Sequence, residues 1–246
     1  AKAAQDTSKP FTQIIEEKLL KYRGQSEKEL CKEFDVNFNA KGRNSTLVRK
    51  ILGLSSDIDS TAEFKKANMN IRAIRVDKSG LPKEDSPFKN YHFIEIANEK
   101  EWEESHIYTE IFSRKFMFVV FRENETGDFC LDQVKFWGFP DSLEPELMRV
   151  WQETKEIINQ GIKLTIKPNG EDGVKVSTNF PQSKANEYLF TKVHASQTYY
   201  EVKPGEFVGK GKLKDTDELP DGRRITKHSF WLPKKFVQQI LRGEWD

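Results

Sequence analysis

The sequence has little of what a disulfide-stabilised, zinc-binding or membrane-spanning protein requires. Its two cysteines, Cys31 and Cys130, lie far apart and neither has a C-x-x-C partner, which argues against a disulfide framework and a zinc ribbon. We expect both to pack as small hydrophobic residues. No apolar run approaches the ~20 residues that cross a bilayer, and the polar first ten residues do not resemble a signal peptide. The expected protein is cytoplasmic and has no membrane partner.

Charge of one sign is also missing, because the formal net charge is only +1. Attraction to nucleic acid must therefore come from local basic patches and not from the chain as a whole. With 246 residues, 36% hydrophobic and 32% charged, the chain is long enough for one large domain or two small lobes. This composition is typical of a folded globular protein.

Several common catalytic motifs are absent. None of the four histidines, His92, His106, His194 and His228, belongs to an H-E-x-x-H or C-x-x-C setting. The run PGEFVGKGK lacks the G-x-x-x-x-G-K-[ST] spacing of a phosphate loop, and no G-x-S-x-G elbow is present. The chemistry must be sought elsewhere.

The hydrophobic pattern predicts an α+β protein with helices at both ends. Apolar residues at helical spacing indicate helices near residues 14–20, 26–34 and 47–54, the second with a capping box of Ser26 and Glu29. Further helices are predicted from about Glu144 to Asn159 and after Pro233. Strands of a largely antiparallel sheet are expected in MNIRAIRVD, HFIEI, KFMFVVFRE, FCLDQVKFWGF, KLTIK, GVKVS, YLFTKVH and KHSFW, with a Gly- and Lys-rich loop before the last of these.

The segment around Glu63-Phe64-Lys65 carries the letters of a metal-dependent nuclease of the PD-(D/E)-x-K kind. Such a site needs a carboxylate and a lysine two residues apart on a strand, so that both leave the same face, and a further acid such as Asp57 or Asp59 to share the Mg²⁺. STAEFKKAN is poor in β-branched residues and does not indicate a strand. The better strand follows it and presents Asn70 and Arg72, which supply neither negative charge nor a base.

Basic residues gather in three places. KGRNSTLVRK holds Lys41, Arg43, Arg49 and Lys50, the stretch from Lys192 to Lys214 has five lysines against two glutamates, and GRRITKHSFWLPKK holds Arg223, Arg224, Lys227, Lys234 and Lys235 without an acid. Lysine and arginine with nearby amides and aromatic rings suit a groove that binds duplex DNA. Composition alone leaves the alternative open that these are solvated surfaces.

The order of these segments resembles the MutH family, which comprises the GATC-nicking mismatch-repair endonuclease and related GATC-cutting type II restriction enzymes. The runs that carry the resemblance are MNIRAIRVDKSGLPKED, MRVWQETKEIINQGIKLTIKPNGEDGVKV, FTKVHASQTYY and HSFWLPKKFVQQIL. It covers nearly the whole chain and is greater for the C-terminal, regulatory half of the restriction enzymes, notably in KEFDVNFNAKGRN, HFIEIANEKEWEES and RKFMFVVFRE. It implies a MutH-like, restriction-endonuclease-like fold: a mixed, mostly antiparallel sheet flanked by helices, with two lobes around a DNA cleft.

The resemblance also implies the domain organisation. Residues 1–10 are a linker, and residues 11–246 are one MutH-like DNA-binding domain. Its helical lobe is expected at about 11–60, and the sheet and C-terminal lobe at about 68–246.

Carried over position by position, the resemblance implies a degenerate catalytic site. The family's E-L-K falls on Asn70-Ile71-Arg72, its preceding aspartate near Glu63, its helical acid near Arg49 and a further basic residue on Lys115. Its H-x-R-P-like base-reading turn corresponds to Lys192-Val193-His194-Ala195, where histidine cannot form the bidentate fork of arginine. The DNA-binding residues expected on these grounds and from the basic clusters are Lys41, Arg43, Arg72, Lys115, Lys192, His194, Gln197, Lys227, Trp231, Lys234 and Lys235.

The function expected from the resemblance is that of a regulatory, effector-site domain of a type II restriction endonuclease that recognises GATC-like duplex DNA and does not cut it. Its partners are double-stranded DNA and a catalytic N-terminal half of the same polypeptide. The domain needs no cofactor, whereas the whole enzyme uses Mg²⁺. Two alternatives stay open: an active Mg²⁺-dependent endonuclease using Asp57, Glu63 and Lys65, and a protein-interaction domain without DNA binding.

Overall fold

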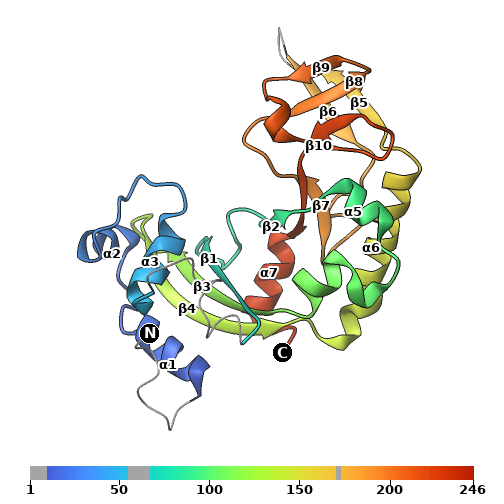
Figure 1. Ribbon diagram of the computed structural model, residues 1–246. Coiled ribbons are helices and arrows are strands. Elements are labelled where there is room, and N and C mark those ends of the chain that lie inside the picture. The colour runs from blue at the N-terminus through green and yellow to red at the C-terminus, as the bar shows by residue number, and fades with distance from the viewer. Residues whose placement is uncertain (1–9, 55–66, 170–172) are drawn as a thin grey trace. The chain divides into compact units, whose positions relative to one another are not determined.

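The computed structural model describes residues 10–54, 67–169 and 173–246 (Figure 1). Its helices are α1 (Phe11–Leu20), α2 (Glu27–Glu33), α3 (Arg43–Leu52), α5 (Phe93–Asn98), α6 (Glu144–Asn159) and α7 (Lys234–Leu241), with short turns η2 (Trp102–Glu104), η3 (Tyr108–Phe112), η4 (Asp141–Leu143) and η5 (Leu213–Asp215). Its strands are β1 (Met69–Val76), β2 (Ser86–Asn90), β3 (Lys115–Glu123), β4 (Phe129–Gly138), β5 (Leu164–Pro168), β6 (Val174–Thr178), β7 (Phe190–Val193), β8 (Tyr199–Lys203), β9 (Glu206–Gly209), β10 (Thr216–Glu218), β11 (Arg224–Thr226) and β12 (His228–Leu232). The expected α+β class is confirmed.

The chain divides into two compact units, each assembled from separate segments. The first consists of Ala1–Lys83, Ser113–Pro140 and Val237–Asp246, and the second of Glu84–Phe112 and Asp141–Phe236. The helices of the N-terminal region therefore share a unit with the strands β1, β3 and β4. Within the described part of the chain, no helix has the length and apolar character needed to cross a bilayer.

A three-stranded sheet in the order β1-β3-β4 is the centre of the first unit. β4 is antiparallel to β3 as expected, but β1 is parallel to it, with Met69 opposite Lys115. β3 is buried continuously from Phe116 to Phe121 because both of its faces are covered. This explains why KFMFVVFRE is an unbroken apolar run and not an alternating one.

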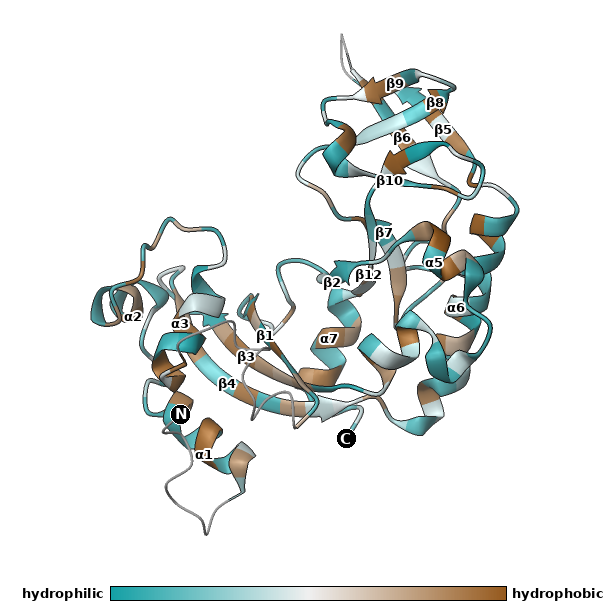
Figure 2. Ribbon diagram, viewed as in Figure 1, coloured by the Kyte–Doolittle hydropathy of each residue, from teal (hydrophilic) through white to brown (hydrophobic). Residues whose placement is uncertain are grey.

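The helices α1, α2 and α3 pack on one face of this sheet. Their apolar residues meet Met117, Val119 and Phe121, which leave β3 on the same side because side chains alternate along a strand. Cys31 lies within this core, as expected for a small hydrophobic residue. On the other face, the ring of Phe116 packs against Trp137 and Phe139. Figure 2 shows the resulting band of hydrophobic residues along β3.

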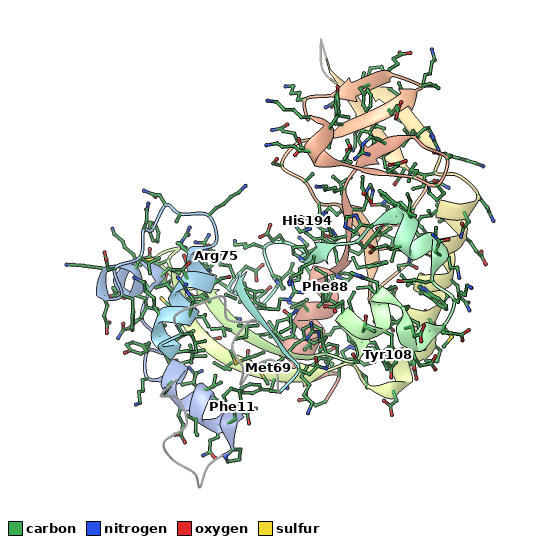
Figure 3. All side chains as sticks on the ribbon, viewed as in Figure 1. Phe11, Met69, Arg75, Phe88, Tyr108 and His194 are labelled. Atoms are coloured by element: carbon green, nitrogen blue, oxygen red, sulfur yellow. The ribbon has the colours of Figure 1, made fainter. Side chains whose placement is uncertain are left out.

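The buried carboxylate of Glu27 joins α2, α3 and β1. Glu27 is only 3% exposed and accepts hydrogen bonds from Arg43 Nη2 at 3.0 Å, Arg75 Nε at 2.6 Å and Asn44 Nδ2 at 2.6 Å. Arg75, labelled at the end of β1 in Figure 3, also forms an ion pair with it through Nη2. Glu27 follows the predicted capping box of Ser26 and Glu29, which is confirmed.

The second unit contains a sheet in the order β2-β12-β7 and three two-stranded pairs, β5-β6, β8-β9 and β10-β11. Both neighbours of β12 are antiparallel to it. α6 has the predicted bounds and packs against α5. The pair β8-β9 lies where a Gly- and Lys-rich loop was expected, and β2 had no sequence prediction.

The strand predicted for HFIEI is wrong, because these residues begin the helix α5. The buried side chains are Phe93, Ile96 and Ala97, which is helical spacing, while Ile94 is exposed. Asp217 stabilises the start of this helix by accepting a hydrogen bond from the Phe93 backbone N–H at 2.9 Å. That acceptor is 124 residues away in the sequence, so the local pattern does not reveal it.

A buried polar pair and a buried histidine lie beneath the sheet of the second unit. Tyr91 Oη and Thr191 Oγ1 share a hydrogen bond of 2.5 Å, and burial raises the pKa of Tyr91. His228 donates from Nδ1 to the Thr226 carbonyl at 2.7 Å and packs between the rings of Phe93 and Phe180. Burial lowers the pKa of His228 to about 4.

Replacing Glu27 by Gln should destabilise the protein by about 3 kcal/mol, because Arg43 and Arg75 would lose the charge that compensates them in a partly buried site. Urea unfolding followed by circular dichroism measures this loss. The matched control is Glu125→Gln, which removes a pair with Lys78 from a side chain that is 91% exposed. Equal unfolding midpoints for the two variants would contradict the role given to Glu27.

Acid should weaken the fold through His228. The folded protein keeps this residue neutral down to about pH 4, whereas in the unfolded chain it takes up a proton near pH 6.5. The unfolded state therefore binds more protons between these values, and the free energy of unfolding falls by up to about 1.4 kcal/mol per pH unit as the pH decreases. His228→Asn keeps a donor for Thr226 and should show a correspondingly flatter dependence in urea titrations from pH 4 to 7. Identical slopes would show that His228 does not contribute.

Candidate functional site

Two strands of the second unit, β7 and β12, bring together three of the residues predicted to bind DNA: Lys192, His194 and Trp231. In β7 and β12, Lys192 lies opposite Ser229, and Phe190 opposite Trp231. Because side chains alternate along a strand, Lys192, Ser229 and Trp231 share one face, and His194 follows on the same side two residues after Lys192. We call Asp85, Lys192, His194, Ser229 and Trp231 the β7–β12 surface.

Lys192 is the exposed cation of this surface. Its ammonium group lies 3.3 Å from Asp85 Oδ2 and 4.9 Å from the centre of the Trp231 ring. The Trp231 indole N–H donates to the Lys192 carbonyl at 3.3 Å, which fixes the ring beside the strand. The charge is therefore positioned by one carboxylate and one aromatic face, while the Lys192 side chain stays partly exposed to solvent.

His194 is oriented by contacts on several sides. Its Nδ1 shares a hydrogen bond of 2.9 Å with Ser229 Oγ, and its ring meets Trp231 edge to face at 5.1 Å. Its backbone carbonyl accepts from Asn90 Nδ2 at 2.8 Å. Figure 3 labels His194 at the end of β7. Ser229 is fully buried, so its hydroxyl orients the imidazole and is not placed to attack a substrate.

Asp85 was not predicted, although it holds two parts of the surface in place. Besides Lys192, it accepts a hydrogen bond from the backbone N–H of Lys234 at 3.0 Å, at the first residue of α7. A carboxylate in this position satisfies a free helical N–H and interacts favourably with the helix dipole. Asp85 lies 107 residues from Lys192 in sequence, and no local motif indicates the contact.

The remaining DNA-binding residues predicted for the second unit either adjoin the β7–β12 surface or are exposed to solvent. Lys227 accepts a backbone hydrogen bond from His194 at 2.8 Å and donates one to Asp215 at 2.9 Å. The Lys212 backbone N–H hydrogen-bonds the Asp215 carboxylate and lowers its pKa. Gln197 and Lys235 are exposed. Cations, one imidazole and one indole thus lie on connected segments of a single unit.

The positions that match the family's catalytic strand lie in the first unit. Asn70 and Arg72 are in register with Phe116 and Phe118 of β3, and both are half-buried. Lys115 is exposed at the start of β3. Mg²⁺ requires several oxygen ligands with negative charge among them, and Asn70, Arg72 and Lys115 supply one neutral amide and two cations. These residues do not fit a magnesium ion, and the described chain contains no group of three or more His, Cys, Asp and Glu that could hold a metal.

The four cations around α3 have different surroundings. Lys41 is exposed before the helix, and Arg49 is half-buried on it. Arg43 is bound to Glu27, and Lys50 donates to the carbonyls of Phe34 and Asp35 at 2.7 Å each. Two of the four predicted phosphate-facing charges are thus engaged with acceptors inside the protein.

Asp57, Asp59, Glu63 and Lys65, the residues of the alternative nuclease site, lie outside the described residues, so their arrangement stays a prediction.

No family model matches the chain. The chain is similar to the type II restriction enzyme Sau3AI of Staphylococcus aureus, with 26% identity over 94% of this chain and 51% of that enzyme. It therefore spans about half the length of the relative. The similarity supports a relationship to restriction enzymes.

Asp85→Ala should cost about 1 kcal/mol of unfolding free energy, chiefly because the first N–H of α7 loses its acceptor. Lys192→Met keeps that cap and removes only a partly exposed ion pair, so its effect should be smaller. Chemical denaturation of the two variants in parallel measures the difference. An equal loss in both would mean that the ion pair, and not the helix cap, is the important contact.

Proposed function

We propose that this chain is a MutH-like DNA-binding domain that corresponds to the C-terminal, regulatory half of a two-site type II restriction endonuclease. It binds a GATC-like effector site in duplex DNA and does not cut it. Its partner within the same polypeptide is a catalytic N-terminal half, and Mg²⁺ is used by that half alone. Occupancy of the effector site favours the active state of the whole enzyme by coupling the two DNA affinities.

The observation that carries the proposal is the β7–β12 surface. Lys192 presents a positioned ammonium group for a phosphate, and His194 and Trp231 present a hydrogen-bonding ring and an aromatic face beside it. Phosphate contacts of this kind fix a protein on the duplex, whereas ring and amide groups distinguish base edges. A DNA phosphate can take the place of Asp85 as the counter-charge of Lys192, because that pair is partly exposed.

The similarity to Sau3AI supports the class of enzyme, since its name describes a type II restriction enzyme and the match runs through nearly the whole of this chain. Coverage of about half of that enzyme agrees with a chain that is one part of a two-part architecture. The family resemblance of the sequence favours the C-terminal half for this part.

A non-cutting role follows from the residues on β1. A nuclease of this class needs a carboxylate where Asn70 stands and a lysine where Arg72 stands, and Arg72 stays protonated and cannot activate water. A cationic guanidinium favours a bound phosphate over a bound metal ion. The replacement of the family's residues by Asn70 and Arg72 therefore both prevents cleavage and favours binding of DNA phosphate.

An electrophoretic titration tests this function. The chain is mixed with short duplexes that contain GATC or a scrambled site, first in EDTA and then in Mg²⁺, and both the shifted fraction and the cleaved fraction are measured. Selective binding to the GATC duplex with intact DNA is the expected result. Cleavage in Mg²⁺ that disappears in Glu63→Ala would establish the nuclease alternative, and no binding to either duplex would favour a protein-interaction domain.

Two classes of substitution should behave differently in this assay. Lys235→Ala should weaken binding to all sequences and reduce the slope of log affinity against log salt by about one, because it removes a phosphate contact. His194→Ala and Trp231→Ala should instead narrow the gap between the GATC and scrambled duplexes, with little change in the slope. An unchanged slope for Lys235→Ala would show that this lysine does not contact the backbone of DNA.

A further inference from the structure

A short basic turn of the second unit carries an exposed leucine that the function above does not use. The turn consists of residues 210–215, between β9 and β10, and contains Lys210, Lys212 and Lys214. Leu213 lies among these lysines and is 57% exposed, the highest value among the exposed large hydrophobic residues of the described chain. Single exposed apolar residues are common on protein surfaces, and what distinguishes Leu213 is its place among three exposed lysines.

The turn is held in one conformation by hydrogen bonds on both sides of Leu213. The Asp215 carboxylate accepts from the Lys212 backbone N–H at 3.0 Å, and the Thr216 hydroxyl donates to the Leu213 carbonyl at 2.7 Å. Gly211 donates to the Thr198 carbonyl at 3.0 Å, where an added Cβ would lie 3.1 Å from that oxygen. The leucine is thus presented by a constrained backbone, which lowers the entropy lost when a partner covers it.

The turn is also connected to the β7–β12 surface. Ser196 Oγ, two residues beyond His194, lies 3.1 Å from Asp215 Oδ1. The backbone of Lys227 links Asp215 to His194 through hydrogen bonds of 2.9 and 2.8 Å. The basic turn is therefore joined by hydrogen bonds to the segment that carries His194.

From these observations we propose that the basic turn is a second DNA-contacting element, in which Leu213 inserts between base pairs in the minor groove while the flanking lysines meet phosphates. Apolar wedges of this kind unstack a base step and bend the duplex, and the surrounding positive charge compensates the backbone. The inference rests on the proposed function and adds to it a deformation of the bound site. Sequence preference would then depend partly on how easily the step opens.

The test uses duplexes that contain GATC and carry 2-aminopurine at successive positions, because this base fluoresces more strongly when it is unstacked. Binding of the unaltered chain should raise the fluorescence at one step. Leu213→Ala should abolish that rise and weaken binding about tenfold, since it removes the buried part of the side chain. Leu213→Lys should also abolish the rise while it steepens the salt dependence, because it adds charge without a wedge.

The matched control is Ile94→Ala, which shortens another exposed apolar residue of the second unit, 41% exposed on α5. It should leave both the affinity and the fluorescence rise unchanged. Thermal unfolding confirms that each variant is folded, which is expected because these side chains are exposed.

The outcomes separate the two proposals. If the unaltered chain binds the GATC duplex but no position brightens, or if Leu213→Ala retains the rise, the wedge is wrong and the DNA-binding function stands. If the unaltered chain binds no duplex, both proposals fail. The unaltered chain could instead bind vesicles of phosphatidylserine. If Leu213→Ala loses this vesicle binding while its DNA binding persists, the turn belongs to a lipid-binding surface and the wedge is overturned.

Discussion

The ionic cluster around Glu27 is the interaction on which the first unit depends. One buried carboxylate receives two guanidinium groups and one amide, and these come from α3 and β1 while Glu27 itself lies on α2. The arginines also lie over aromatic rings, Arg43 over Phe38 and Arg75 over Phe129. A cluster with these contacts fixes the register of helices against strand in a way that apolar packing alone does not. It also decides which charges remain for a ligand, because Arg43 is engaged within the protein.

In the second unit, side chains alternate along β7 and β12, so that core residues and the residues proposed to bind DNA occupy the same two strands. One side of these strands faces the interior, with Thr191, His228 and Phe230 buried, whereas the other carries Lys192 and Trp231 beside the buried Phe190 and Ser229. The same few residues thus supply a core and a charged surface. Rigid strands hold the surface groups more precisely than a loop would, and long-range acceptors such as Asp85 fix them from the side.

Sequence predicted much of this arrangement where the signal was local. β3, β4 and α6 followed from apolar patterns, and the capping box at Ser26 and Glu29 followed from a four-residue motif. The approach of Lys192, His194 and Trp231 is consistent with spacing by two in neighbouring strands. The predictions that failed, and the features that were missed, depend on partners far away in the sequence. HFIEI is apolar enough for a strand, but Asp217 caps it as a helix, and the parallel pairing of β1 with β3 leaves no trace in either segment. Arg43 belongs to a basic segment that predicts a DNA contact, but in the structure it is bound to Glu27.

The discontinuous make-up of the first unit has a consequence for how the chain acquires its structure during synthesis. β1 emerges from the ribosome long before β3, its parallel neighbour, and the intervening chain belongs largely to the second unit. The first unit also includes Val237–Asp246, whose Leu241 carbonyl accepts from Gln133 on β4. Neither unit can therefore mature as an independent early product. The helices α1, α2 and α3 keep their apolar faces uncovered until β3 and β4 have been synthesised, because residues of these two strands complete their core.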